Sequence, residues 1–210
     1  MASAIRPLIS TYGRRLTVAG LGGLLVGILT SIGQGALPDL LSPVANSAGA
    51  WCLAAFALAL TDREPRRAAL LGALALAAML AGYAVATALD GNVLSTRANV
   101  FWGAAAVVVG PVLGVGAAWL RGSSPVLAGL GISPIAGILI GEGIYGLTVI
   151  ADTTPAAYWA AQMVVGSLLL IAVAAHLRVL RAIVLMCAAT AVVAAAFYVV
   201  YSGNLLSLLP

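Results

Sequence analysis

Long apolar stretches, separated by short polar segments, run through almost the whole chain. There are seven, at about residues 16–37, 44–61, 68–89, 99–120, 125–150, 156–176 and 182–202. A helix needs roughly 20 apolar residues to cross a hydrocarbon core of about 30 Å, and most of the stretches reach that length. They lack the alternation of apolar and polar positions that is typical of a membrane β-strand. The pattern therefore predicts an all-α fold, a polytopic transmembrane helix bundle of about seven spans that forms one membrane domain over residues 1–210.

The second stretch is the exception to this regularity. Its purely apolar part, from Ala48 to Leu60, is too short to cross a bilayer by itself. It spans only if Pro43, Asn46 and Ser47 enter the membrane with it. The alternative is six spans plus a segment near 44–61 that re-enters the membrane from one side.

The arginines predict the orientation of the bundle. Cytoplasmic loops of membrane proteins are enriched in Arg and Lys. With the N-terminus in the cytoplasm, nine of the ten arginines lie on the cytoplasmic side: Arg6, Arg14, Arg15, Arg63, Arg66, Arg67, Arg121, Arg178 and Arg181. Arg97 alone lies outside, as does the uncharged C-terminus. We therefore expect a multi-pass protein of the inner (cytoplasmic) membrane with a cytoplasmic N-terminus.

The composition agrees with a membrane protein and limits which binding partners are expected. Hydrophobic residues make up 63% of the chain and charged residues only 8%, far from the values of soluble domains. The net charge of +4 comes from dispersed arginines, which form no stripe suited to phosphate contacts. The expected surroundings are the lipid bilayer, and nucleic acid is not an expected partner.

Several kinds of chemistry are excluded by residues that are scarce or missing. The chain has no lysine, so it cannot hold retinal as a Schiff base. Its single histidine, His176, cannot provide bis-histidine haem ligation or a multi-histidine metal site. No nucleophile elbow, phosphate-binding loop or zinc-protease helix is present. We expect no enzymatic activity, no cofactor and no metal.

Glu142 is the one acidic or basic side chain deep inside an apolar stretch. A carboxyl group there is costly unless it is protonated, paired or facing a wet cavity, which makes it a candidate functional residue. If ionised, it would attract a cationic solute, and if protonated, it could exchange protons during transport. The structural alternative is a neutral acid bonded to a neighbouring helix, for example to Gln34 or Gln162.

Other polar and aromatic residues are expected in the outer half of the bundle with Glu142. Amide, hydroxyl and aromatic groups at neighbouring helix ends can fix the orientation of a bound solute. The candidate binding residues are Glu142, Tyr145, Gln34, Asn46, Trp51, Tyr83 and Trp102. The alternative for the polar members is local, since Asn46 or Ser47 is a suitable N-cap for the following helix.

The first span carries small residues at every fourth position, beginning with Ala19, Gly23 and Gly27. Such a face lets another helix approach closely, which is how helices associate in lipid. It predicts a docking surface, either for a helix of this chain or for a transmembrane partner subunit.

These residues carry two resemblances. The segment from Gly27 to Pro38, Ala45-Asn46-Ser47 before Trp51, Gly82-Tyr83 and Gly141-Glu142 resembles a group of uncharacterised small bacterial multi-pass membrane proteins. The layout of short spans with a substantial first loop is similar to the substrate-binding S components of energy-coupling-factor vitamin transporters. That similarity would imply a solute pocket under the first loop and docking of Ala19, Gly23 and Gly27 on a coupling subunit. The S components usually have six spans with both ends in the cytoplasm, which differs from the arginine pattern here.

Three functions follow from these expectations. The first is a small-solute binding or transport protein with a pocket around Glu142. The second is a structural or assembly subunit in which Glu142 meets a partner group and no cavity. The third is a proton-coupled transporter acting alone, which predicts an inverted repeat that the spans do not show.

Overall fold

A computed structural model describes residues 2–92 and 96–203, with side chains from residue 11 onward. Its elements are α1 (Ala2–Ala36), the 3-10 helix η1 (Ser42–Asn46), α2 (Ala48–Ala59), α3 (Pro65–Leu89), α4 (Thr96–Leu120), α5 (Pro125–Thr148), α6 (Ala156–Leu177) and α7 (Leu180–Ser202). No strand occurs in these ranges. The predicted all-α bundle is therefore confirmed.

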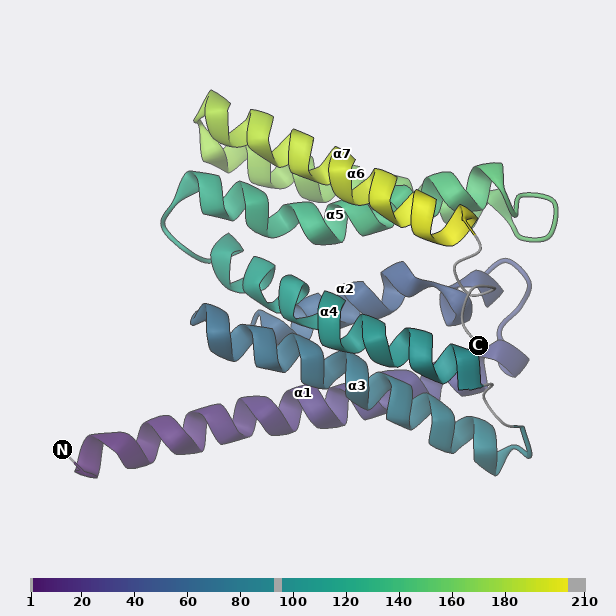
Figure 1. Cartoon of the computed structure of the whole chain (residues 1–210), viewed down its shortest axis with the longest axis horizontal. Helices are drawn as coiled ribbons and strands as arrows, with labels where there is room; N and C mark the ends of the chain where they lie inside the picture. The colour runs from purple at the N-terminus through teal and green to yellow at the C-terminus, as the bar shows by residue number, and fades with distance from the viewer. Residues whose placement is uncertain (1, 93–95, 204–210) are drawn as a thin grey trace.

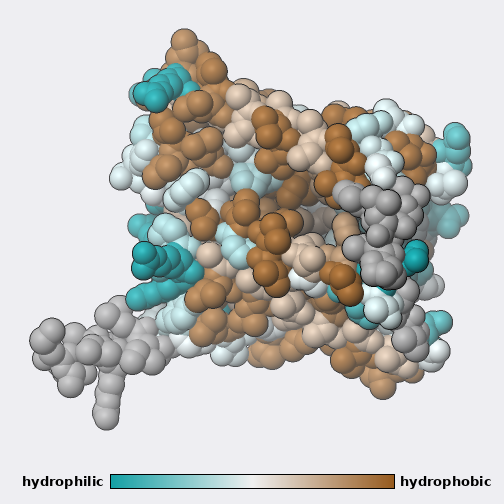
Figure 2. Space-filling view, viewed as in Figure 1, coloured by the Kyte–Doolittle hydropathy of each residue, from teal (hydrophilic) through white to brown (hydrophobic). Residues whose placement is uncertain are grey.

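Six of the helices are long and apolar enough to cross a membrane, and only α2 is too short. Their bounds differ by a few residues from the predicted spans, except that α1 begins well before its expected start at residue 16. Apolar side chains cover the middle of the molecule, and hydrophilic ones gather toward its two ends (Figure 2). This is the architecture of a multi-pass membrane protein.

The short helix α2 nevertheless takes the chain from one end of the bundle to the other. Helices α1 and α3 lie side by side and run parallel, because Arg15 meets Asp62 just before α3 and Ser31 bonds Thr87 near the end of α3. Two parallel neighbours require a return segment between them, and α2 with η1 forms it (Figure 1). Twelve helical residues rise only about 18 Å, so η1 and the flanking loops complete the passage. The first residue of α1 and the last of α7 therefore lie at opposite ends.

Helix α5 is the centre of the bundle and packs against α2, α4, α6 and α7. It passes through Pro134 without interruption as far as Thr148. A Cβ atom on Gly141 would lie 2.6 Å from the carbonyl oxygen of Ala194 in α7, so this position needs glycine for close packing. The glycine next to Glu142 thus allows close helix approach without unwinding α5.

The small-residue face of α1 is filled from within the chain. Ala19 is fully buried, and a Cβ atom on Gly23 would lie 2.5 Å from the carbonyl oxygen of Ala75 in α3. Gly27 is just as close to the backbone of α3. In the structure, this face docks on α3, a helix of the same chain.

The arginines lie mainly at one end of the bundle. They are found in the first half of α1, where α3 and α7 begin and where α4 and α6 end, whereas Arg97 lies at the start of α4, at the other end. The segregation that the sequence predicts is therefore present in three dimensions. That the arginine-rich end faces the cytoplasm stays a prediction from the charge rule.

Candidate functional site

The Glu142 side chain is 3% exposed and binds the N-terminal end of α2. The backbone N–H of Ala48 donates to Oε1 over 2.8 Å, and that of Gly49 donates to Oε2 over 2.8 Å. The hydroxyl of Ser47 donates to Oε2 over 2.8 Å, and the side-chain amide of Gln162 in α6 donates to the same oxygen. Four donors from two helices and a cap thus converge on one carboxylate.

This arrangement follows from the local chemistry of a helix start. The first N–H groups of a helix have no partner within it and carry a partial positive charge. Ser47 is the N-cap of α2 and accepts from the N–H of Ala50 over 3.0 Å, while Glu142 accepts from the two N–H groups that remain free. A Cβ atom on Gly49 would lie 2.6 Å from Oε2 of Glu142, so only glycine lets the carboxylate come this close. Glu142 therefore completes the cap of a helix that begins inside the bundle.

The C-terminal end of α2 is held by charged residues of other helices. Arg121, after α4, donates to the carbonyl oxygen of Leu60. Asp62, 3% exposed, accepts from Nη1 of Arg15 over 2.6 Å and from the N–H of Glu64 over 2.9 Å. Burial by itself would raise the pKa of Asp62, but the backbone hydrogen bond from Glu64 and the Arg15 guanidinium outweigh it and hold this pKa below its ordinary value.

A second polar group lies toward the C-terminal ends of α1 and α3. The amide nitrogen of Gln34 donates to Oδ1 of Asn46 over 2.8 Å, and the hydroxyl of Tyr83 donates to Oε1 of Gln34 over 2.8 Å. These contacts fix η1 and the first loop against the bundle. Gln34 therefore belongs to this group, and Gln162 alone of the two expected amides reaches Glu142.

Trp51 connects this polar group to the interior. Its indole N–H donates to the hydroxyl of Thr30 over 3.1 Å, and its ring centroid lies 6.0 Å from that of Tyr83. On its other side the ring lies 5.8 Å from that of Trp102 in α4. The aromatic contacts continue in α7, where Tyr201 lies 5.6 Å from the ring of Tyr145.

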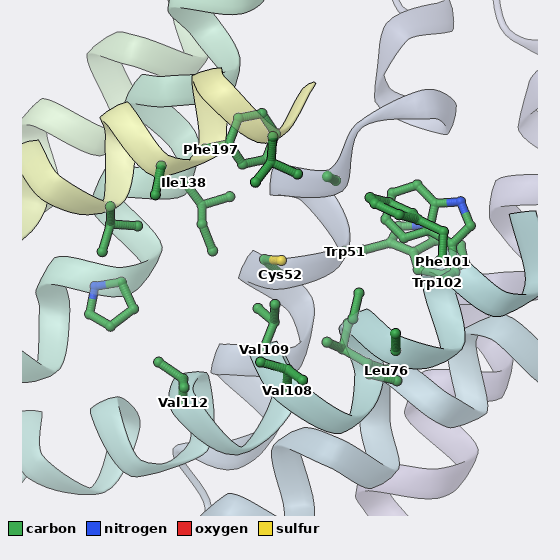
Figure 3. A pocket seen from close by; sticks show the side chains of 18 of the residues that line it. Trp51, Cys52, Leu76, Phe101, Trp102, Val108, Val109, Val112, Ile138 and Phe197 are labelled. Atoms are coloured by element: carbon green, nitrogen blue, oxygen red, sulfur yellow. The ribbon is translucent and has the colours of Figure 1, made fainter. Parts of the chain in front are cut away.

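Beside α2 lies a cavity of about 440 Å³. Its walls come from α2, α3, α4, α5 and α7, and the side chains around it point inward from several helices (Figure 3). The lining residues are Ala48, Trp51, Cys52, Leu76, Phe101, Trp102, Ala104, Ala105, Ala106, Val108, Val109, Val112, Pro134, Ile138, Val193, Ala196, Phe197, Val200 and Tyr201. None of these described residues is charged, so the cavity suits an apolar molecule.

The cavity opens sideways between α4 and α7. Val108 and Val112 line it and yet are 65% and 50% exposed. The backbones of α4 and α7 stay apart, and the rings of Phe101 and Tyr201 bridge them with a centroid distance of 6.2 Å. Both helices face the viewer in Figure 1. Because this opening lies along two apolar helices, the cavity faces the hydrocarbon region of a membrane.

The expected binding residues thus fall into three places. Trp51 and Trp102 line the cavity. Gln34, Asn46 and Tyr83 form the polar group next to Trp51. Glu142 and Tyr145 lie outside the lining, with Glu142 bonded to the backbone of the cavity-lining Ala48.

Residues that the sequence did not single out form most of the cavity wall. Phe101 and Tyr201 look like ordinary interfacial aromatics, and Cys52 like a packing residue. Val108 and Val112 differ in no way from other valines of the span. The spacing of Phe101, Ala105, Val108 and Val112 puts them on one side of α4, and this is the only signal that the sequence carried.

Neither the comparison with curated proteins nor that with solved structures finds a match. The model of DUF6518, described as a family of unknown function, matches residues 6–206, which is nearly the whole chain. This agrees with the expected uncharacterised family and brings no activity with it. The chain therefore belongs to the family of unknown function DUF6518.

Proposed function

We propose that the protein binds a small, largely apolar solute in the cavity between α4 and α7, without catalysis, as a binding or transport component of a bacterial inner membrane. The observation that carries this proposal is the uncharged aromatic and aliphatic lining of a space of about 440 Å³. Ligand sites in proteins commonly measure roughly 300–1,000 Å³ and are mostly apolar. The lateral opening provides a route from the membrane.

In this proposal Glu142 positions the site and does not bind the solute directly. Its carboxylate already accepts four hydrogen bonds from Ser47, Ala48, Gly49 and Gln162. A solute that bound Glu142 would have to replace those donors at the start of α2. Holding α2 in place also holds Trp51, which contributes its ring to the cavity wall.

The similarity to S components adds a more specific form of the proposal. A pocket under the first loop fits the Gln34, Asn46 and Tyr83 group, which ties η1 to the bundle beside Trp51. Docking on a coupling subunit would need a surface other than Ala19, Gly23 and Gly27, because α3 covers these residues. Transport with a partner stays a prediction.

The second candidate function is a structural or assembly subunit of a membrane complex. It is favoured by the hydrogen bonds of Glu142, which are all made within the chain, while Glu142 itself is not among the residues that line the cavity. If this candidate is right, Glu142→Gln changes the stability of the protein and leaves its function intact. The presence or absence of a ligand in the cavity distinguishes the two candidates.

The test is mass spectrometry of small molecules extracted from purified wild type, Val109→Phe and Val107→Phe. Val109 lines the cavity, so phenylalanine there fills it, whereas Val107 is 73% exposed and outside the lining. We expect a compound that wild type and Val107→Phe retain and that Val109→Phe loses by at least about tenfold. This follows because the added phenyl ring occupies space that the solute needs, and two groups cannot fill the same volume.

Equal amounts of every extracted compound in three equally folded proteins would contradict solute binding in this cavity. Glu142→Gln serves as a further comparison. If it folds, it should keep the compound, because Glu142 is not part of the lining.

A further inference from the structure

The cavity has the shape of a groove along α4. Its lining on this helix runs from Phe101 to Val112, which corresponds to a length of about 17 Å. It is open on the side through the exposed Val108 and Val112. A long chain can lie in such a groove and enter it sideways, which a compact solute does not require.

One basic residue lies beyond the outer end of this groove. Arg97 is in the first turn of α4, four residues before Phe101, so the two share one side of the helix about 6 Å apart along its axis. Arg97 is exposed, and no described residue forms an ion pair with it. An apolar groove is thus continued by a guanidinium that has no ion pair among the described residues, at the level where the span ends.

Among the described residues, Arg97 is the basic side chain at this end of the bundle. Asp39, Asp90 and Asp152 lie in loops or at helix ends on this side. Within the described ranges, the remaining arginines lie at the opposite end, and Arg121 of the same helix is about 36 Å away along the axis. An acidic group at the mouth of the groove would therefore meet Arg97 and no competing arginine.

We infer that the ligand of the cavity is an anionic phospholipid, with one acyl chain in the groove and its acidic headgroup at Arg97. This inference rests on the proposed function and names the class of ligand. A guanidinium forms paired hydrogen bonds with phosphate oxygens, which suits a phosphodiester at the membrane surface. Phosphatidylcholine also has a phosphodiester, but its ammonium group offsets that charge, so a lipid with a net negative charge gains more from Arg97.

The test uses phosphatidylglycerol and phosphatidylcholine that carry the same dibrominated acyl chains, added to the purified full-length protein. Bromine quenches tryptophan fluorescence on contact, and Trp51 and Trp102 both line the cavity. Quenching that Val109→Phe removes and Val107→Phe keeps reports a chain inside the cavity. The apparent affinities for the two lipids are compared in wild type, Arg97→Gln, Arg97→Lys and Arg181→Gln.

We expect wild type to prefer phosphatidylglycerol by about fivefold, the factor that one basic side chain contributes near anionic lipid. Arg97→Gln should abolish this preference and keep the binding of phosphatidylcholine. Arg97→Lys, and Arg181→Gln at the other end of the bundle, should retain it.

Two results would overturn the inference, and they have different meanings. Cavity-dependent quenching that is equal for both lipids, or a preference that survives in Arg97→Gln, would reject an acidic headgroup while leaving a ligand in the cavity. Quenching that Val109→Phe does not change would place no acyl chain in the cavity and would reject a lipid ligand, whereas the extraction experiment decides separately whether another solute binds there.

Discussion

Two buried carboxylates, Glu142 and Asp62, hold the two ends of α2, and they are stabilised in different ways. Each is 3% exposed. Asp62 lies at the arginine-rich end and pairs with Arg15 over 2.6 Å. Glu142 lies within the bundle, and its four donors in the described structure are two backbone N–H groups, a hydroxyl and an amide.

The difference shows how position in the bundle determines what can stabilise an acid. Near the end of the bundle, Arg15 keeps 33% of its side chain exposed, so the ion pair retains part of its hydration. Deep inside the bundle, removing both charges of an ion pair from water costs a large desolvation free energy. Neutral hydrogen-bond donors and the N-terminus of a helix stabilise an acid there at a lower cost. A helix of 12 residues is marginal alone, so α2 depends on both arrangements.

The largest expected effect is that of Glu142→Leu, which removes the acceptor from four buried donors. Each buried donor left without a partner costs about 1–3 kcal/mol, so with four of them little folded protein should remain. Glu142→Gln keeps the shape but turns one acceptor into a donor, at a cost of about 1–3 kcal/mol. Thermal unfolding in detergent measures both.

The matched control is Thr148→Leu, an exposed position on the same helix. If Glu142→Leu were no less stable than Thr148→Leu, the role of Glu142 as the cap of α2 would be rejected.

A smaller effect is expected for Asp62→Asn, which leaves Arg15 without its partner. A charge-assisted hydrogen bond contributes about 1.5–3 kcal/mol. Because the pKa of Asp62 is lower in the folded protein than in the unfolded chain, its stabilisation is complete above the ordinary aspartate pKa of about 4. That stabilisation is lost as the pH falls through the lowered pKa of the folded state.

Unfolding temperatures of wild type and Asp62→Asn should therefore differ by a constant amount from pH 8 to pH 5 and converge below about pH 4. A difference that grew as the pH fell would contradict the direction of this pKa shift.

The smallest effect is expected for Arg121→Gln, which removes the contact with the carbonyl oxygen of Leu60. Arg121 is exposed, so ordering its long side chain offsets much of the gain, and the loss should be about 0.5 kcal/mol. Amide hydrogen exchange should show faster exchange in the last turn of α2 only. Arg181→Gln is the control at the same end, and an equal change there would mean that the Leu60 contact has no specific effect.

The apolar pattern predicted the long helices well because bilayer thickness imposes a length that a sequence must match. It also identified Glu142 as unusual, since a lone acid in an apolar stretch needs partners. The pattern could not choose between Gln34 and Gln162 as the partner of Glu142, because both lie toward the same end of the bundle. Only the packing of α5 against α6 decides between them. The cavity was not predicted either, as its valines and alanines look like any lipid-facing residues.

The sequence by itself determined the class, the spans, the segregation of the arginines and the need for partners around Glu142, because hydrophobicity and charge act locally along the chain. Only the tertiary structure decided that Glu142 caps α2, that α3 covers the small-residue face of α1, and that a cavity lies between α4 and α7. Those outcomes depend on which helix surfaces meet, and many pairings of small and apolar side chains have similar energies until the whole bundle is packed.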